Sequence, residues 1–149
     1  MNTVTGDIWC VANPNDFVVI PTNGIVKANG ELVMGAGLAK QARDRVPGCA
    51  SYFGTLVRNS GNHVYRMHRA GKPKLVSFPT KNHYRDPSTI QLISRSAVEL
   101  NELAHTLPTG RFLLPMVGTG YGGLKWVKVK QTIDLIIDAP NIIIIEDER

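Results

Sequence analysis

The chain has 149 residues, of which 43% are hydrophobic, and carries a formal net charge of +5. These values predict one compact domain over residues 1–149 with its own hydrophobic core. The sequence has no apolar run near the ~20 residues that span a bilayer and no basic-then-apolar leader, so we expect a cytoplasmic monomer without a membrane partner. Cys10 and Cys49 lack the spacing of a zinc site, and we expect unbridged thiols, no metal and no cofactor.

Strand-like runs alternate with helical patterns along the chain. In chain order the sequence predicts a strand at 3–11, a strand at 16–21, a helix at 37–45, a helical stretch at 50–57, short apolar runs at 63–68 and 74–78, a long helix at 88–103, a strand at 111–116, a helix at 124–137 and a last strand at 141–145. A turn at 70–73 separates the two short runs. This alternation predicts an α/β fold with a largely parallel sheet.

Two glycine-bearing segments each follow a predicted strand and lead into a predicted helix. Residues 34–39 read Met-Gly-Ala-Gly-Leu-Ala, and residues 118–123 read Gly-Thr-Gly-Tyr-Gly-Gly. Glycine lets backbone N–H groups approach a ligand closely, and a following helix adds N–H donors and the positive end of its dipole. The pair of loops predicts a clamp for a ligand with two phosphates. The alternative is that these glycines serve only tight turns.

Positive residues are concentrated in the middle of the chain, whereas its end is acidic at residues 146–148. The basic residues and histidines of this cluster are Arg66, His68, Arg69, Lys72, Lys74, Lys81, His83 and Arg85. The cluster fits either an ordinary solvated face or attraction for a polyanion, which would be a nucleotide or nucleic acid. Aromatic residues are not interleaved as in a single-strand binding platform, so charge permits nucleic acid without establishing it.

A third loop follows the predicted strand at 74–78. Ligands of open α/β sheets bind beyond the carboxyl ends of the strands, where such loops gather. Lys81 lies at this strand end, between a proline and an Asn-His pair, and is a candidate for chemistry. The alternative is a surface charge, which is the commonest role of a lysine.

Together these segments resemble a known family, the macrodomains, which bind ADP-ribose. The resemblance spans nearly the whole chain and rests, in the family's order, on residues 6–8, a strand ending in Asn23, residues 34–37 and residues 118–120. It is closest to the branch that contains the terminal ADP-ribose protein glycohydrolase and the DarG antitoxin. The segment ending at Trp126, Gly-x-Gly-x-x-x-Leu-x-Trp, is similar to that branch. The resemblance implies a three-layer α/β/α macrodomain sandwich around a central mixed, largely parallel sheet.

The resemblance also implies roles for particular residues. Asp7 would accept a hydrogen bond from the adenine amine, Asn23 would lie near the distal ribose, and Tyr121 would cover that ribose or the phosphates. The implied substrate-binding residues are Asp7, Ile8, Asn23, Met34, Gly35, Ala36, Gly37, Leu38, Thr80, Val117, Gly118, Thr119, Gly120, Tyr121 and Gly122. The residues alone leave alternatives open: Asp7 as a turn aspartate that binds backbone amides, Asn23 as a turn residue, and Tyr121 as an ordinary exposed tyrosine.

Lys81 aligns with the catalytic lysine of this branch, which is thought to attack the anomeric carbon of the distal ribose. Such an attack needs the amine in its neutral form. Partial burial and nearby cations such as Arg85 favour that form, while a bound diphosphate opposes it. The terminal ADP-ribose glycohydrolase also has an aspartate in its second loop, and the matching residue here is Gly122. His83 and Asp86 are alternative proton donors, or else structural.

The resemblance therefore implies an ADP-ribosyl glycohydrolase, with Lys81 as its catalytic residue, that releases ADP-ribose from modified macromolecules. ADP-ribosylated DNA is the favoured substrate, because of the basic balance and the DarG-like second loop, and protein glutamate or aspartate comes next. Two other functions stay open. One is a reader that binds ADP-ribose without cleaving it, for which the missing carboxylate argues; the other is a phosphatase acting on ADP-ribose 1''-phosphate. At this length we expect no toxin-binding extension.

Overall fold

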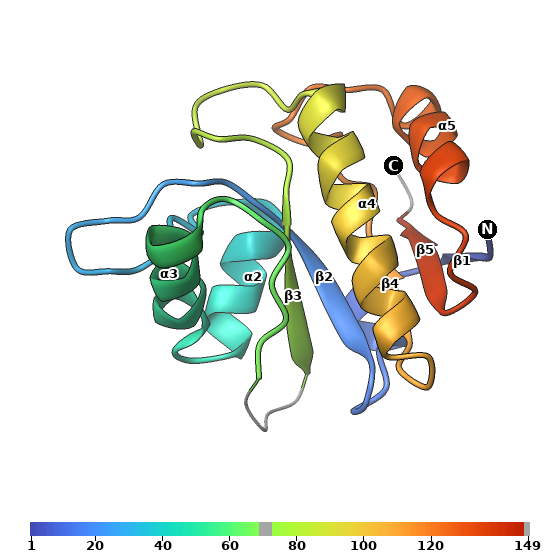
Figure 1. Cartoon of the computed structure of the whole chain (residues 1–149), viewed down its shortest axis with the longest axis horizontal. Coiled ribbons are helices and arrows are strands. Elements are labelled where there is room, and N and C mark those ends of the chain that lie inside the picture. Colours follow the sequence, from blue (N-terminus) through green and yellow to red (C-terminus); the bar gives the residue numbers. More distant parts are fainter. Residues whose placement is uncertain (69–72, 148–149) are drawn as a thin grey trace.

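A computed structural model describes residues 1–68 and 73–147 of the chain. Strands and helices alternate along it (Figure 1). They are β1 (Thr3–Thr5), α1 (Ile8–Val11), β2 (Phe17–Thr22), α2 (Gly37–Arg45), α3 (Cys49–Ser60), β3 (Lys74–Pro79), α4 (Ile90–Thr106), β4 (Phe112–Leu114), α5 (Trp126–Ile136) and β5 (Ile142–Glu146). The helix predicted at 37–45 is confirmed to the residue, and the other main elements are confirmed with shifted ends.

The strands form one sheet in the order β1-β5-β4-β2-β3, and every pair of neighbouring strands is parallel. Residues 63–68 run beside β3 but add only an isolated antiparallel bridge, between Arg66 and Val76. The predicted largely parallel sheet is therefore confirmed. Because the five strands point the same way, their carboxyl ends lie along one edge of the sheet, which we call the carboxyl edge.

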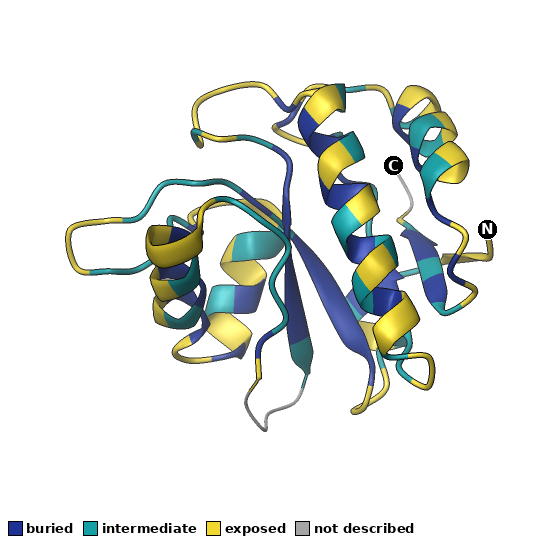
Figure 2. Cartoon of the chain, in the orientation of Figure 1, coloured by how far each residue is buried: buried dark blue, intermediate teal, exposed yellow. Residues whose placement is uncertain are grey.

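Helices cover both faces of the sheet, and successive side chains along each strand point to opposite faces. In β2, Val18 and Ile20 belong to a core with α2 and α3, while Phe17 and Val19 belong to a second core with α4 and α5. The central strands are buried, and exposed residues gather on the helices and loops (Figure 2). The expected three-layer α/β/α sandwich is confirmed.

The strand predicted at 3–11 is wrong beyond residue 5. Asp7 ends it, because its side chain accepts hydrogen bonds from the backbone N–H groups of Trp9 (2.8 Å) and Cys10 (3.4 Å) and so caps the short helix α1. A similar cap sets the start of α4, since Thr89 Oγ1 accepts from Leu92 N at 3.3 Å. This helix therefore begins at residue 90 rather than at 88.

Some expectations fall on residues that the structure does not describe. Residues 70–72 of the predicted turn, Arg69 and Lys72 of the basic cluster, and Glu148 lie outside the described part of the chain.

Cys10 is exposed and Cys49 is buried, and they form no disulfide with each other, as expected. Within the described residues no helix has the length and apolar character needed to cross a bilayer.

Candidate functional site

Every residue predicted to bind or react lies on a loop that leaves the carboxyl edge, or in the first turn of the helix that follows. After β1 come Asp7 and Ile8; after β2, Asn23 and residues 34–38; after β3, Thr80 and Lys81; and after β4, residues 117–122. The tertiary structure thus brings four loops, far apart in the sequence, to one edge. In Figure 1 the loops after β3 and β4 lie above the sheet.

Strand order arranges these segments in a row. Asp7 follows the edge strand β1, residues 117–122 follow β4, residues 34–38 follow the adjacent β2, and Lys81 follows the opposite edge strand β3. Four inter-strand steps separate the two ends of the row, which corresponds to about 19 Å. The arrangement suits an elongated ligand better than a compact one.

The first glycine loop leaves open space where a ligand could approach. Gly35 does not have a positive φ, and a Cβ added to it would meet no atom within 4 Å. The fold therefore does not require glycine at this position. Ala36, the N-cap of α2, provides no side-chain cap for the helix, so the first backbone N–H groups of α2 can serve a ligand.

The second glycine loop contains both a glycine that the fold does not require and glycines that it does require. Gly120 resembles Gly35, since it has no positive φ and an added Cβ would meet nothing within 4 Å. Gly118 is structural, because its φ is +78° and an added Cβ would lie 2.6 Å from Ile93 Cδ1. Gly122 is structural too, since an added Cβ would lie 2.3 Å from Ser88 Oγ and 2.5 Å from the Gly118 carbonyl oxygen. The position of the missing carboxylate therefore has no space for a side chain.

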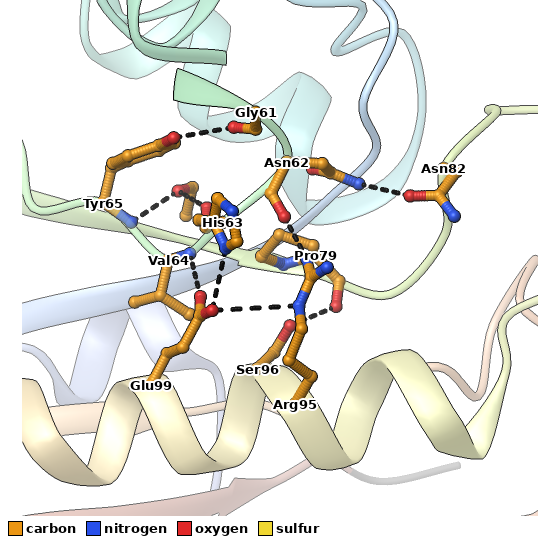
Figure 3. Close-up of polar contacts among 11 residues, drawn as sticks. Gly61, Asn62, His63, Val64, Tyr65, Pro79, Asn82, Arg95, Ser96 and Glu99 are labelled. Carbon is orange, nitrogen blue, oxygen red and sulfur yellow. Dashed lines mark hydrogen bonds and ion pairs between the residues drawn. The ribbon is translucent and has the colours of Figure 1, made fainter.

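Lys81 is half-buried, and its backbone is fixed by the neighbouring segments. Asn62 Nδ2 donates to the carbonyl oxygen of Lys81 (3.0 Å) and to Asn82 Oδ1 (3.1 Å; Figure 3). The backbone N–H of Gly24 donates to the carbonyl of Asn82 at 2.9 Å, which joins the loops after β2 and β3. Hydrogen bonds therefore fix the backbone of Lys81 just after the end of β3.

Asn62 is itself held by α4 (Figure 3). Arg95 donates to the carbonyl oxygen of Asn62 and lies 3.8 Å from Glu99 Oε2. Glu99 also accepts from Val64 N at 2.9 Å and contacts His63 Nδ1 at 2.8 Å. The sequence did not single out Asn62, because an asparagine just after a helix is typical of a turn. Only the packed structure shows that it reaches Lys81.

Tyr65 belongs to the same group of contacts. Burial, and after it the charge of Glu99, raises the pKa of Tyr65 above its ordinary value. The phenol accordingly stays protonated at neutral pH and donates to the Gly61 carbonyl at 2.7 Å.

Asp7 and Asn23 both have structural contacts of the kind that the sequence left open. Asp7 caps α1 through Oδ1 and is exposed. Asn23 donates from Nδ2 to the Val33 carbonyl (2.9 Å) and accepts at Oδ1 from Ile25 N (3.0 Å), so it closes the loop after β2. Their roles as adenine and ribose contacts stay predictions.

The remaining candidates differ in exposure. Thr80 and Val117 are buried, whereas Tyr121 is 84% exposed. His83 Nδ1 accepts from the Arg85 backbone N–H at 3.1 Å, which places the proton of a neutral His83 ring on Nε2.

Trp126, which ends the second-loop motif, anchors that loop to the sheet. Its Nε1 donates to Glu146 Oε2 at 2.6 Å, and Glu146 Oε1 lies 3.6 Å from Lys130 Nζ. The end of β5 thereby fixes the start of α5.

A hollow of about 250 Å³ elsewhere contains none of the residues predicted to bind or react, although Val64 and Tyr65 of the contacts around Asn62 line it. Its lining is Leu56, Val64, Tyr65, Arg66, His68, Leu103, Thr106 and Leu107. The candidate site is the carboxyl edge instead, because Gly35, Gly120 and Lys81 lie there. The described residues contain no cluster of three potential metal ligands.

Comparison with known proteins identifies relatives of this chain. It is 31% identical over 113 residues to a DNA ADP-ribosyl glycohydrolase of Thermus aquaticus, and 28% identical over 107 residues to one of Mycobacterium tuberculosis. These matches cover 72% and 68% of the chain but only 31% and 30% of the relatives, so the chain spans about a third of their length. No family model matches the chain.

Solved structures agree over almost the whole chain. The macrodomain of Thermus aquaticus DarG matches with a TM-score of 0.79 and 25% identity, over 99% of this chain and 97% of that one. Thermosipho africanus DarTG in complex with ADP-ribose matches with a TM-score of 0.82 and 21% identity, over 99% of this chain and 42% of that one. The fold, the two glycine loops and these relatives together show that the chain belongs to the macrodomain family, in the DarG branch.

Proposed function

We propose that this macrodomain is an ADP-ribosyl glycohydrolase that releases ADP-ribose from ADP-ribosylated DNA. The observation that carries the proposal is the order of the segments along the carboxyl edge. From β1 to β3 they run from the predicted adenine contact through the two glycine loops to Lys81. ADP-ribose has its groups in the same order: adenine, two phosphates and a distal ribose with the scissile bond.

The phosphates would bind between the two glycine loops. Gly35 and Gly120 leave open space there, and the uncapped first turn of α2 supplies N–H donors and a helix dipole. This would direct the distal ribose towards β3 and the side chain of Lys81. Asp7, at the opposite end of the row, would accept from the adenine amine with the Oδ2 atom that the cap of α1 leaves available.

Lys81 would act on the anomeric carbon of the distal ribose. As a nucleophile, its neutral Nζ forms a C–N bond while the bond to the acceptor breaks, and the electron pair leaves with the acceptor. Nζ then gives up its extra proton, and water hydrolyses the adduct to free ADP-ribose and the regenerated amine. As a cation, the same group would instead orient the scissile bond for attack by water.

A DNA base suits the absence of a second-loop carboxylate. General acid assistance typically contributes ~10²–10⁴-fold, and an acceptor that delocalises the charge it receives needs less of it. A ring nitrogen of a base is such an acceptor, and so is the carboxylate of a protein ester. The positive balance of the chain and the activity named for its curated relatives favour DNA.

A reader of ADP-ribose is the second candidate. It is favoured by the packing at Gly122, which leaves no space for the acid of a two-residue mechanism. A reader would bind ADP-ribose with comparable affinity whether or not Lys81 is present.

The test measures release of ADP-ribose from a modified oligonucleotide and from a glutamate-modified protein. We expect the unaltered chain to cleave the oligonucleotide and Lys81→Ala to be at least ~100-fold slower, by analogy with the loss of a proton-transfer group. Lys40→Ala, at an exposed lysine on α2, is the matched control and should stay active. Lys81→Arg keeps the charge without the nucleophile, and borohydride would trap a ribose–lysine adduct only in the nucleophilic mechanism.

Other outcomes identify the alternatives. Release from protein alone moves the substrate class to protein esters, and phosphate release from ADP-ribose 1''-phosphate indicates the phosphatase. Tight binding of ADP-ribose without any release contradicts the hydrolase and leaves the reader.

A further inference from the structure

The basic cluster of the sequence does not form one patch. Among its described members, His68 and Lys74 lie near the beginning of β3 and Arg66 is bridged to Val76, whereas Lys81, His83 and Arg85 follow the end of the strand. The length of β3, about 20 Å, separates Lys74 from the second group. Only the second group belongs to the carboxyl edge and the candidate site.

Exposed aromatic residues accompany this second group. Tyr84 is 41% exposed in the loop after β3, and Tyr121 is 84% exposed in the loop after β4. The two loops are joined, since Ser88 N donates to the Gly122 carbonyl at 3.0 Å. The other two tyrosines, Tyr52 and Tyr65, are partly buried and hydrogen-bonded. Aromatic residues that are far apart in the sequence therefore meet the cations at one edge.

Residues 83–85 form an ordered stack, which we call the aromatic-basic platform. The rings of His83 and Tyr84 are 4.4 Å apart between centroids and inclined by 30°. The guanidinium of Arg85 lies 5.6 Å from the centroid of the Tyr84 ring. Two backbone N–H groups donate to His83 and fix the turn: Arg85 N to the ring Nδ1 at 3.1 Å and Asp86 N to the carbonyl oxygen at 3.0 Å. These contacts fix the three side chains relative to one another.

The charge around the platform favours a polyanion. Lys81 and Arg85, together with the exposed Lys125 and Lys128 beside the second loop, make no ion pair within residues 1–68 and 73–147. Asp86 is the one acidic residue of the loop between Thr80 and Thr89. Planar groups next to unpaired cations are what single-stranded nucleic acid binds, through base stacking and phosphate contacts.

We propose that His83, Tyr84 and Arg85 hold the DNA strand on either side of the ADP-ribosylated nucleotide. Tyr84 stacks with a neighbouring base, and Arg85 contacts a backbone phosphate. This inference rests on the proposed function, because it places the acceptor just beyond Lys81, where the bond to the distal ribose is cleaved. A protein ester offers neither a base to stack nor a row of phosphates.

The test first measures binding of an unmodified single-stranded oligonucleotide at low salt. We expect Tyr84→Ala to raise the Kd about fivefold or more, and Tyr84→Phe, which keeps the ring, to bind as the unaltered chain does. Arg85→Ala should weaken binding and lower the slope of log K against log salt by about 0.7, the value for one phosphate contact on a single strand. Leu135→Ala, at an exposed residue of α5, and Arg43→Ala, at a partly exposed residue of α2, are controls that should change nothing.

A second measurement compares cleavage of an ADP-ribosylated oligonucleotide with that of an ADP-ribosylated mononucleotide. Tyr84→Ala should reduce the preference for the oligonucleotide about fivefold or more, with the affinity for free ADP-ribose as the check that the site is intact. Wild-type oligonucleotide binding in both Tyr84→Ala and Arg85→Ala overturns the proposal. The proposal is also overturned if the unaltered chain does not bind the oligonucleotide, or if Tyr84→Ala and Arg85→Ala lose activity only on protein substrates.

The two proposals fail separately. If the chain cleaves nothing but its oligonucleotide binding depends on Tyr84, the platform is supported and the glycohydrolase is not. If it cleaves ADP-ribosylated DNA equally well with or without Tyr84, the glycohydrolase is supported and the platform is not.

Discussion

Glycine serves two different purposes in the loops around the site. Gly118 has a positive φ and no space for a Cβ, so the fold requires it. Gly35 and Gly120 have neither restriction, and each borders open space. Since the chain itself does not need glycine at these two positions, the close approach of a ligand is the physical reason that we assign to them.

This distinction predicts opposite effects for two alanine substitutions. Gly35→Ala should leave the free energy of unfolding unchanged or raise it by up to about 1 kcal/mol, because alanine restricts the unfolded chain, while weakening ADP-ribose binding about tenfold or more. Gly118→Ala should lower the unfolding free energy by about 1–3 kcal/mol through strain and overpacking against Ile93. Urea denaturation and calorimetric titration measure the two quantities. Unchanged ADP-ribose affinity in Gly35→Ala would contradict the ligand explanation.

Asn62 holds the backbone of Lys81 and would therefore position the proposed catalytic amine. Asn62→Asp keeps the size of the side chain but replaces its two N–H donors with an oxygen, which would face the Lys81 carbonyl and Asn82 Oδ1. We expect kcat to fall about 10- to 100-fold, because small displacements of a reacting group are costly, while KM changes little.

The matched control for Asn62 is Asn101→Asp. Asn101 also makes side-chain hydrogen bonds, to Asp138 and Ala139, but these residues precede β5 and so lie at the edge of the sheet opposite to Lys81. Both variants should lose some thermal stability, and only Asn62→Asp should lose kcat. An equal loss of kcat in both would show that Asn62 acts through general stability.

At the scale of whole elements, the loop after β3 packs against the second glycine loop. Ser88 is buried, its backbone N–H donates to the Gly122 carbonyl, and its hydroxyl makes no hydrogen bond within the described residues. The two loops therefore pack as one unit. This packing, and not only the glycine at position 122, leaves no space for a carboxylate side chain there.

This packing predicts that the acid cannot be restored by a single substitution. Gly122→Asp should lower the unfolding free energy by about 1–3 kcal/mol, because its Cβ would overlap Ser88 Oγ and the Gly118 carbonyl. It should not raise the rate of ADP-ribose release. A stable variant that releases ADP-ribose faster from protein esters would show that the loop can open and that the acid is compatible with this fold. Gly120→Asp, at an open position of the same loop, is the control for added negative charge.

At the scale of the whole molecule, the edge opposite the site is held by an ion pair in which Asp16 is buried and the side chain of Arg111 is partly exposed. Arg111 Nη2 donates to Asp16 Oδ2 at 2.6 Å, which joins the beginnings of β2 and β4. Burial by itself raises the pKa of Asp16, but the hydrogen bonds from Arg111 and Asn13 and the charge of Arg111 outweigh it and leave the pKa below its ordinary value. The charged pair therefore stabilises the fold at neutral pH.

The lowered pKa of Asp16 predicts how stability depends on pH. The contribution of the pair is fully present above the ordinary pKa of an aspartate, about 3.9, and is lost as the pH falls through the lower folded-state pKa. Asp16→Asn should destabilise the protein by about 1–3 kcal/mol at pH 7, and the difference between the two proteins should shrink below about pH 4. Unfolding free energies measured across this range check the prediction. A difference that stays constant down to pH 2 would mean that Asp16 has no lowered pKa.

The sequence by itself determined the class of fold and predicted the segments of the candidate site. Alternating strand and helix patterns predicted the sandwich, because burial on two faces of a sheet imposes those patterns locally. The motifs at 34–39 and 118–126 indicated the family, since the residues of each loop motif are neighbours in the sequence. Local pattern failed at residues 8–11, where a single cap turns an apolar run into a helix.

Only the tertiary structure decided what long-range packing controls. It divided the basic cluster between two edges, showed that Asn62 reaches Lys81 and that Gly122 has no space for a side chain, and brought Tyr84 and Tyr121 onto joined loops. The order of the strands, and with it the order of the segments from Asp7 to Lys81, was also invisible in the sequence. These features depend on contacts between residues far apart in the chain, and no local pattern specifies such contacts.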